Sequence, residues 1–284
     1  MSDINQLLNQ HSFVELSARE RVKALLDAGS MRELLDPFDR IKSPWLELQG
    51  IVSQADDGVV VAKGSIAGKP VVVAAIEGDF QGGSMGEVSG AKIASALELA
   101  IEDNRQGIPC VAVLLLETGG VRLQEANLGL AAIADIHSAI VGLRAYQPVI
   151  GVVAGTVGCF GGMSIAAALC SHLVVTREAR IGLNGPQVIE QEAGLEEYDS
   201  RDRPFIWSFT GGEQRYASGL ADKFCKDSID AIKDQIATLV QSDLPHFRSD
   251  QYDYFLTQLS QAGVEQVGPE RVRELYVDLE EQLL

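Results

Sequence analysis

Apolar and polar positions follow two different periods along the chain. Short runs rich in β-branched residues predict buried strands over residues 59–63, 70–77, 108–116, 148–154 and 172–176. Helical spacing of apolar residues predicts helices over about 87–105 and 121–145, and a further buried helix over 163–169. Because strands alternate with helices, the pattern predicts a layered α/β fold.

The N-terminal part of the chain carries a strong helix signal. Residues 17–28 (SARERVKALLDA) place Ser17 as the N-cap and Glu20 three positions later, which is a capping box, and Gly29 ends the helix. Residues 30–50, which include two prolines, predict irregular structure.

The C-terminal part predicts a loop followed by helices. A short strand is expected around Ile181, and the polar residues 187–203 predict a surface loop. Amphipathic helical patterns occupy most of residues 212–284. Because no linker rich in Pro, Ser or Gly is visible, we expect residues 1–284 to form one domain with a helical tail.

The segment from Ala145 to Ser171 carries no charge, and its length would suffice for a membrane-spanning helix. Its flanks lack an aromatic belt and a Lys/Arg cluster. We therefore expect a buried strand, a glycine-rich turn over 155–162 and a buried helix in this segment.

Composition and charge exclude several classes of protein. Apolar residues make up 46% of the chain, which is typical of a globular protein. Lys and Arg number 23 against 40 Asp and Glu, so the net charge is −17. Such a surface repels nucleic-acid phosphates and anionic bilayers, so neither nucleic acid nor membrane is an expected partner.

Cysteine and histidine usage predicts a cytoplasmic protein with no metal site. The four cysteines form no CxxC pair and the four histidines are scattered, so we expect reduced, structural thiols. The first 13 residues also lack the charged and apolar regions of a secretory signal. The cysteines are Cys110, Cys159, Cys170 and Cys225.

Three glycine-rich turns, at residues 81–86, 118–120 and 155–162, each lie between an apolar strand and a predicted helix. A helix N-terminus presents unpaired N–H groups with a partial positive charge, and glycine lets a ligand approach the main chain closely. These turns could bind a phosphate or a developing oxyanion, although glycine also serves simply to make tight turns.

Residues 82–86 also match the G-x-S-x-G pattern of serine hydrolases, with Ser84 as the candidate nucleophile. Asp135 and His137 could complete a triad, but two residues apart on one helix they point to different sides. The sequence therefore disfavours a hydrolase, and it contains no G-x-x-x-x-G-K-[ST] phosphate loop.

Four segments resemble, in order, the β subunits of acyl-thioester carboxyltransferases. They are residues 18–30 (ARERVKALLDAGS), 82–92 (GGSMGEVSGAK), 118–125 (TGGVRLQE) and 181–191 (IGLNGPQVIEQ). The resemblance covers roughly residues 13–230. It implies a crotonase-like α/β fold, which is a spiral of ββα repeats.

Two features separate the chain from the acetyl-CoA carboxylase subunits of that group. The four-cysteine zinc ribbon of many such subunits is not present in the sequence, and residues 198–212 (YDSRDRPFIWSFTGG) resemble instead the β subunits of biotin-independent malonate decarboxylases. This resemblance implies decarboxylation of a malonyl thioester on an acyl-carrier protein, without biotin. The implied cofactor is a phosphopantetheine-type group, derived from dephospho-CoA, on the carrier. The implied partners are a homologous γ subunit, the acyl-carrier protein and an acyl-carrier transferase subunit.

The same resemblance implies which residues form the site. Main-chain N–H groups in two turns are expected to hold the enolate oxygen that becomes negative as CO2 leaves. These catalytic positions are Gly119, Gly120, Gly161 and Gly162. The expected substrate-binding residues are Gly83, Ser84, Met85, Gly86, Gly185 and Pro186.

Some roles stay open at this stage. His137 is one candidate for the proton donor to the enolate, and Arg122 and Glu125 could act directly or only support the fold. Two other functions also remain. The chain could be the carboxyltransferase β subunit of a biotin-dependent acyl-CoA carboxylase, or a non-catalytic subunit that shapes a partner's site.

Overall fold

A seven-stranded sheet forms the centre of the molecule, with the strand order β1-β2-β3-β4-β5-β7-β9. The computed structural model describes residues 11–245, 247–262 and 268–276. Neighbouring strands pair antiparallel from β1 to β3 and parallel from β3 to β9. The strands are β1 (Arg32–Leu34), β2 (Val59–Ile66), β3 (Lys69–Ile76), β4 (Val111–Leu115), β5 (Val149–Val153), β7 (His172–Thr176) and β9 (Lys223–Cys225).

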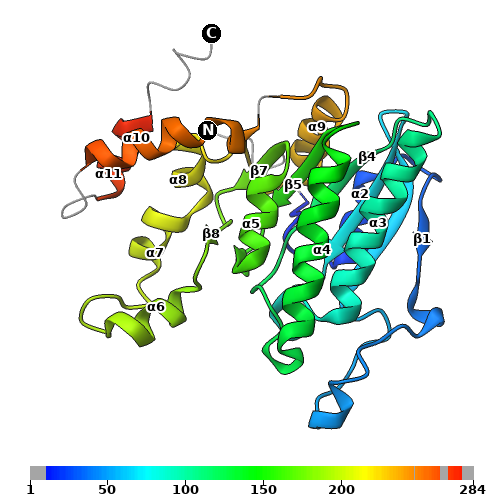
Figure 1. Ribbon diagram of the computed structural model, residues 1–284, viewed down its shortest axis with the longest axis horizontal. Helices are drawn as coiled ribbons and strands as arrows, with labels where there is room; N and C mark the ends of the chain where they lie inside the picture. Colours follow the sequence, from blue (N-terminus) through cyan, green and yellow to red (C-terminus); the bar gives the residue numbers. More distant parts are fainter. Residues whose placement is uncertain (1–10, 246, 263–267, 277–284) are drawn as a thin grey trace.

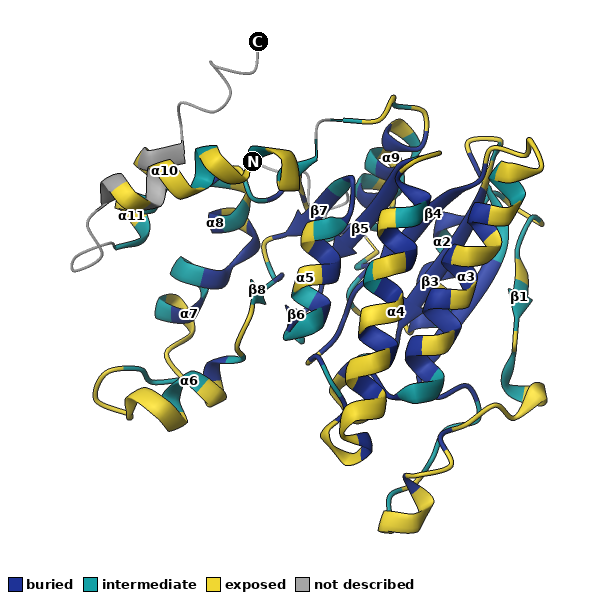
Figure 2. Ribbon diagram, in the orientation of Figure 1, coloured by how far each residue is buried: buried dark blue, intermediate teal, exposed yellow. Residues whose placement is uncertain are grey.

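Helices cover both faces of this sheet (Figure 1). One face packs against α3 (Glu87–Arg105), α4 (Asn127–Leu143) and α5 (Gly162–Leu169), and the other against α2 (Ala18–Leu25) and α9 (Ile229–Leu239). Successive strand residues alternate between the two apolar layers. Because both faces are buried, the strands read as continuous apolar runs, as Figure 2 also shows.

The strands and helices follow one another as ββα repeats. After each of β3, β4, β5 and β7 the chain leaves the large sheet and makes a short second pairing. The strands β6 (Cys159–Phe160) and β8 (Ile181–Gly182) pair in parallel, Thr118 bridges Cys159, and Met85 bridges Val121. This arrangement is the predicted crotonase-like spiral, and it stacks the second pairings of successive repeats beside one another.

The predicted capping box at the start of α2 is confirmed. The Ser17 side chain accepts a hydrogen bond from the Glu20 N–H, and the Glu20 carboxylate accepts one from the Ser17 N–H at 3.0 Å. The helix ends at Leu25, three residues earlier than predicted. The reason is that the carboxylate of Asp27 accepts hydrogen bonds from Ser65 and from the turn between β2 and β3.

The uncharged segment from Ala145 to Ser171 forms β5, β6 and α5, as predicted. Among the described residues, no helix is both long enough and apolar enough to cross a membrane.

Four predicted elements need correction. Residues 32–34, which were predicted to be irregular, form strand β1 and pair with β2. Helix α4 begins at Asn127 instead of residue 121, because Val121 pairs with Met85 and residues 123–125 form a short 3-10 turn. Residues 186–193 form a helix, α6 (Pro186–Ala193), where a loop was predicted, with proline at its first position. The predicted helical tail is interrupted by strand β9, which pairs with β7.

The remaining helices lie beyond α6. They are α7 (Arg203–Thr210), α8 (Gly212–Ala217), α10 (Tyr252–Ala262) and α11 (Pro269–Tyr276). Residues 263–267 and 277–284 of the predicted tail, and residues 1–10, where the absence of a secretory signal was predicted, lie outside the described residues.

Candidate active site

Four turns from successive repeats lie side by side and are joined by main-chain hydrogen bonds. Gly119 N donates to Gly82 O at 2.9 Å, Phe160 N donates to Thr118 O at 3.0 Å, and Gly161 N donates to Leu183 O at 2.8 Å. The turns that the sequence placed far apart along the chain thus form one continuous row.

The second and third of these turns touch at Gly120 and Gly161. Their φ angles are +103° and +60°, a region that side chains disfavour. A Cβ atom at Gly120 would lie only 3.0 Å from the carbonyl oxygen of Phe160 and 3.3 Å from the Cα of Gly161. The structure therefore brings the predicted pairs Gly119-Gly120 and Gly161-Gly162 together, and the contact between them requires glycine.

Three of the four glycine N–H groups are used inside the fold. Those of Gly119 and Gly161 make the bonds between turns described above, and that of Gly120 donates to the hydroxyl oxygen of Thr118 at 3.0 Å. These three groups shape the turns and are already occupied.

The N–H of the fourth glycine, Gly162, and the N–H of Val121 stay available at the same place. Gly162 is the first residue of α5, so its N–H has no acceptor within the helix. Among the described residues, none accepts a hydrogen bond from the N–H of Val121. Both residues are half-buried, so a ligand can reach them. A Cβ at Gly161 would lie 3.9 Å from Val121 N, which places this amide directly against the third turn.

The peptide groups on both sides of Val121 are held by Met85. Met85 N donates to Gly120 O at 2.7 Å, and Arg122 N donates to Met85 O at 2.8 Å. Because the bonds before and after Val121 are both made, the direction of its own N–H is fixed.

A buried ionic cluster around Arg122 reinforces this arrangement. The guanidinium lies 2.8 Å from Asp57 Oδ1 and 2.9 Å from Glu125 Oε1, and it donates to Ser84 O at 3.0 Å. Only 1% of Arg122 is exposed, so it is neither solvated nor in reach of a ligand. Burial raises the pKa of Asp57, although Arg122 opposes that shift.

The carboxylate of Glu125 caps the N-terminus of helix α3 and not that of α4, the helix that follows it in the chain. Its carboxylate accepts hydrogen bonds from Glu87 N, the first residue of α3, at 2.7 Å and from Ser43 Oγ at 2.7 Å. A negative charge at a helix N-terminus is favourable there. A Cβ at Gly86 would lie 2.4 Å from the same carboxylate, so glycine is needed at that position.

Glu117 supports the turn before β6, and sequence reasoning missed it. Its carboxylate accepts from Val157 N at 2.8 Å and pairs with Arg21 at 3.1 Å, and only 5% of the residue is exposed. The available signal was a lone acidic residue directly after the apolar run 108–116.

The predicted substrate-binding residues divide by exposure. Ser84 and Gly185 are half-buried, and nothing lies within 4 Å of a Cβ placed on Gly185. The others, which are Gly83, Met85, Gly86 and Pro186, are buried. Gly83 has a φ of +64°, and a Cβ there would lie 1.9 Å from Glu117 O. Glycine is therefore needed where the first turn packs against the main chain of Glu117.

His137 and Ser84 do not pair. The Nε2 of His137 donates to the carbonyl oxygen of Gly162 at 2.7 Å, whereas Ser84 Oγ accepts from Arg122 at 3.4 Å. Asp135 is exposed. The rejected hydrolase triad is therefore not assembled, and His137 holds the start of α5.

The described part of the chain contains no cluster of three or more His, Cys, Asp or Glu that could hold a metal ion. All four cysteines are free and buried. Burial raises the pKa of Cys110 and of Cys170 to about 12, so these thiols stay protonated.

Residues 9–252 match the family model of the carboxyl transferase domain, and the chain belongs to this family. It is similar to a chain of a Pseudomonas malonate decarboxylase hetero-tetramer solved in complex with malonate. The two are 65% identical with a TM-score of 0.94, covering 96% of this chain and all of the other.

Two further relatives bear on function. A chain of a Pseudomonas malonate decarboxylase hetero-dimer is 57% identical, with a TM-score of 0.75 over 89% of this chain and 98% of that one. The malonyl-S-ACP:biotin-protein carboxyltransferase MADC of Malonomonas rubra is 39% identical, over 84% of this chain and 78% of the relative.

Proposed function

We propose that the chain is the β subunit of a malonate decarboxylase, a carboxy-lyase that converts a malonyl thioester on an acyl-carrier protein to the acetyl thioester and CO2. The observation that carries this proposal is the contact between the Gly120 and Gly161 turns, which leaves two N–H groups unpaired at one place. The 65% identity to a chain of a malonate decarboxylase supports the same substrate.

The chemistry needs an oxyanion site more than a strong base. As the bond between C2 and the carboxylate breaks, CO2 leaves and the electron pair moves onto the thioester oxygen as an enolate. In our proposal the N–H groups of Val121 and Gly162 hold that oxygen, while Gly119, Gly120 and Gly161 shape the turns. Donors fixed in advance stabilise the enolate without reorganisation, and losing one typically costs about 10²–10³ in rate. A proton must then reach C2, and its donor is not assigned.

The phosphopantetheine-type group of the carrier, which bears the malonyl thioester, would lie along the exposed parts of the outer turns. Ser84 and Gly185 are the half-buried members of the predicted substrate-binding set, while the buried members shape the turns that carry them. This prosthetic group belongs to the carrier, and in the proposed decarboxylation no biotin takes part. We also propose a cytoplasmic complex with a homologous γ subunit, the carrier and an acyl-carrier transferase subunit.

Transfer of the carboxyl group to a biotin protein is the second candidate. It is favoured by the relative from Malonomonas rubra, whose name joins malonyl-S-ACP to a biotin protein. The enolate is common to both reactions, so the same turns would serve either one.

A turnover assay separates the two candidates. The chain is co-purified with its homologous partner and mixed with malonyl-carrier protein, and the carrier-bound product is identified by mass spectrometry. We expect acetyl-carrier without added biotin protein, and no effect of avidin. Product that appears only with a biotin protein, and disappears with avidin, would replace the first proposal by the second.

A further inference from the structure

Residues 36–53 form an arm that exposes large apolar side chains. The exposed fraction is 93% for Phe38, 77% for Leu48 and 84% for Val52. The arm extends past the rest of the molecule at the lower right of Figure 1, and most of it is exposed in Figure 2. Exposed apolar side chains gathered on one segment mark an interaction surface.

Hydrogen bonds and buried residues hold the arm to the rest of the molecule, so its exposed side chains have defined positions. Leu46 and Ser43 are buried at its base. Ser43 Oγ donates to Glu125 at 2.7 Å, Trp45 Nε1 donates to Glu87 at 2.7 Å, and Gln49 Nε2 donates to Gln124 O at 2.7 Å. Through Ser43, the base of the arm thus contacts Glu125, which belongs to the ionic cluster around Arg122.

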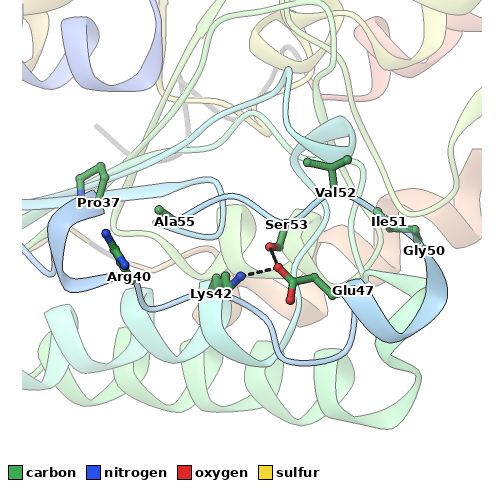
Figure 3. Close-up of a pocket in the computed structure, with 9 residues that line it drawn as sticks. All are labelled: Pro37, Arg40, Lys42, Glu47, Gly50, Ile51, Val52, Ser53 and Ala55. Atoms are coloured by element: carbon green, nitrogen blue, oxygen red, sulfur yellow. Dashed lines mark hydrogen bonds and ion pairs between the residues drawn. The ribbon is translucent and has the colours of Figure 1, made fainter.

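A concavity of about 640 Å³ lies within the arm (Figure 3). Glu47, one of its lining residues, contacts Lys42 and Ser53. Pro37, Ile51, Val52 and Ala55 supply apolar lining. The hollow is open to solvent, so side chains from another protein can reach it.

The arm is continuous with the candidate active site. Gln49 bonds the carbonyl of Gln124, and the neighbouring Leu123 is 81% exposed. Leu123 is two residues from Val121, whose N–H is proposed to hold the oxyanion. A protein seated on the arm therefore reaches the edge of the site.

We propose that the arm is the docking surface for the homologous partner subunit; this inference rests on the proposed function. Stable subunit interfaces are apolar at their centre, whereas brief encounters rely more on charge. Phe38, Leu48, Val52 and Leu123 supply the apolar part of this surface, and the charged residues that the arm exposes are of both signs: Asp39, Arg40, Lys42 and Glu47. Acyl-carrier proteins are usually acidic, so a chain of net charge −17 would repel a carrier. The subunit that stays bound is therefore the occupant.

The test is assembly of the full chain with the partner subunit, measured by analytical ultracentrifugation. The double variant Leu48→Asp/Val52→Asp places two charges on the arm. The control Val141→Asp changes an equally apolar, 53% exposed residue near the far end of α4. We expect the double variant to weaken the complex at least about 100-fold, since buried unpaired charges are costly, and the control to match wild type.

Circular dichroism should show both variants folded, since both arm residues are exposed. Partner binding that is unchanged in the double variant would overturn the proposal. So would a variant that keeps its partner but loses the carrier, because the arm would then be the carrier's site. Because assembly is measured without turnover, an intact interface in a complex that fails to decarboxylate would count against the proposed function alone.

Discussion

Gly120 shows how little of the candidate site depends on side chains. Its φ of +103° and its contact with the third turn are possible only without a Cβ, and the groups proposed to act are main-chain N–H groups. Sequence reasoning located the turns through their glycines. It could not tell which N–H of each turn stays unpaired, because that depends on hydrogen bonds between turns that are distant in the chain.

Gly120→Ala should therefore reduce turnover of malonyl-carrier by about 10²–10³, because the displaced turn misplaces an oxyanion donor. The measurement is kcat of the assembled complex. Gly107→Ala is the matched control, since Gly107 also has a positive φ (+83°) but open space around its Cβ. That control should lose about 1–2 kcal/mol of folding free energy and no activity. Equal activity in the two variants would contradict an oxyanion site formed by Val121 and Gly162 beside this turn.

At the scale of elements, the sequence correctly predicted those helices and strands whose ends depend on neighbouring residues in the chain. Helix α3 begins and ends at the predicted residues, Glu87 and Arg105, and β7 spans the predicted residues 172–176. The start of α4 was misplaced because Arg122 and Glu125, which fit a helix by propensity, are drawn into a buried cluster with Asp57. No local sequence pattern indicates that Arg122 pairs with Asp57, which lies 65 residues away in the chain.

Arg122→Leu tests this cluster. Removing the cation leaves two buried carboxylates without their partner, so we expect the free energy of unfolding to fall by about 3–5 kcal/mol. Urea titration followed by circular dichroism measures it. Arg201→Leu removes an exposed ion pair with Asp199 and should leave stability unchanged. A similar small effect in both variants would show that the cluster does not clamp the turns.

His172 makes stability depend on pH. It lies at the start of β7, its Nε2 is 3.1 Å from Ser242 Oγ, and burial lowers its pKa. Folding therefore favours the neutral ring, so the contribution of His172 is complete above about pH 6.5 and is lost as the pH falls through the lowered pKa. His172→Gln should lose less stability between pH 7 and pH 5 than wild type does in urea titrations. A wild-type slope in His172→Gln would refute the assignment.

At the scale of the whole molecule, the residue pattern predicted a layered α/β fold and the family resemblance implied the crotonase-like spiral, but neither predicted the arm. Residues 30–50 have neither period of two nor helical spacing, so their apolar residues carried no sign of being exposed. That all 284 residues form one domain stays a prediction.

The charge of −17 leads to a prediction about the carrier protein. An acidic carrier should bind the isolated chain weakly, and binding should not weaken as salt rises, because salt screens a repulsion. We expect the partner subunit to supply most of the basic docking surface. Calorimetry of the isolated chain and of the assembled complex, each at low and high salt, measures this. Tight binding to the isolated chain that salt weakens would contradict it.

The large sheet ends in β1 on one side and β9 on the other, and each has only three residues. A strand from a second molecule would find few unpaired N–H and C=O groups along either edge of the sheet. Two molecules are therefore not expected to join their sheets edge to edge. Contacts with other chains are therefore expected at turns, helices and the arm, where they depend on particular side chains, and edge-to-edge pairing of folded molecules into fibres is disfavoured.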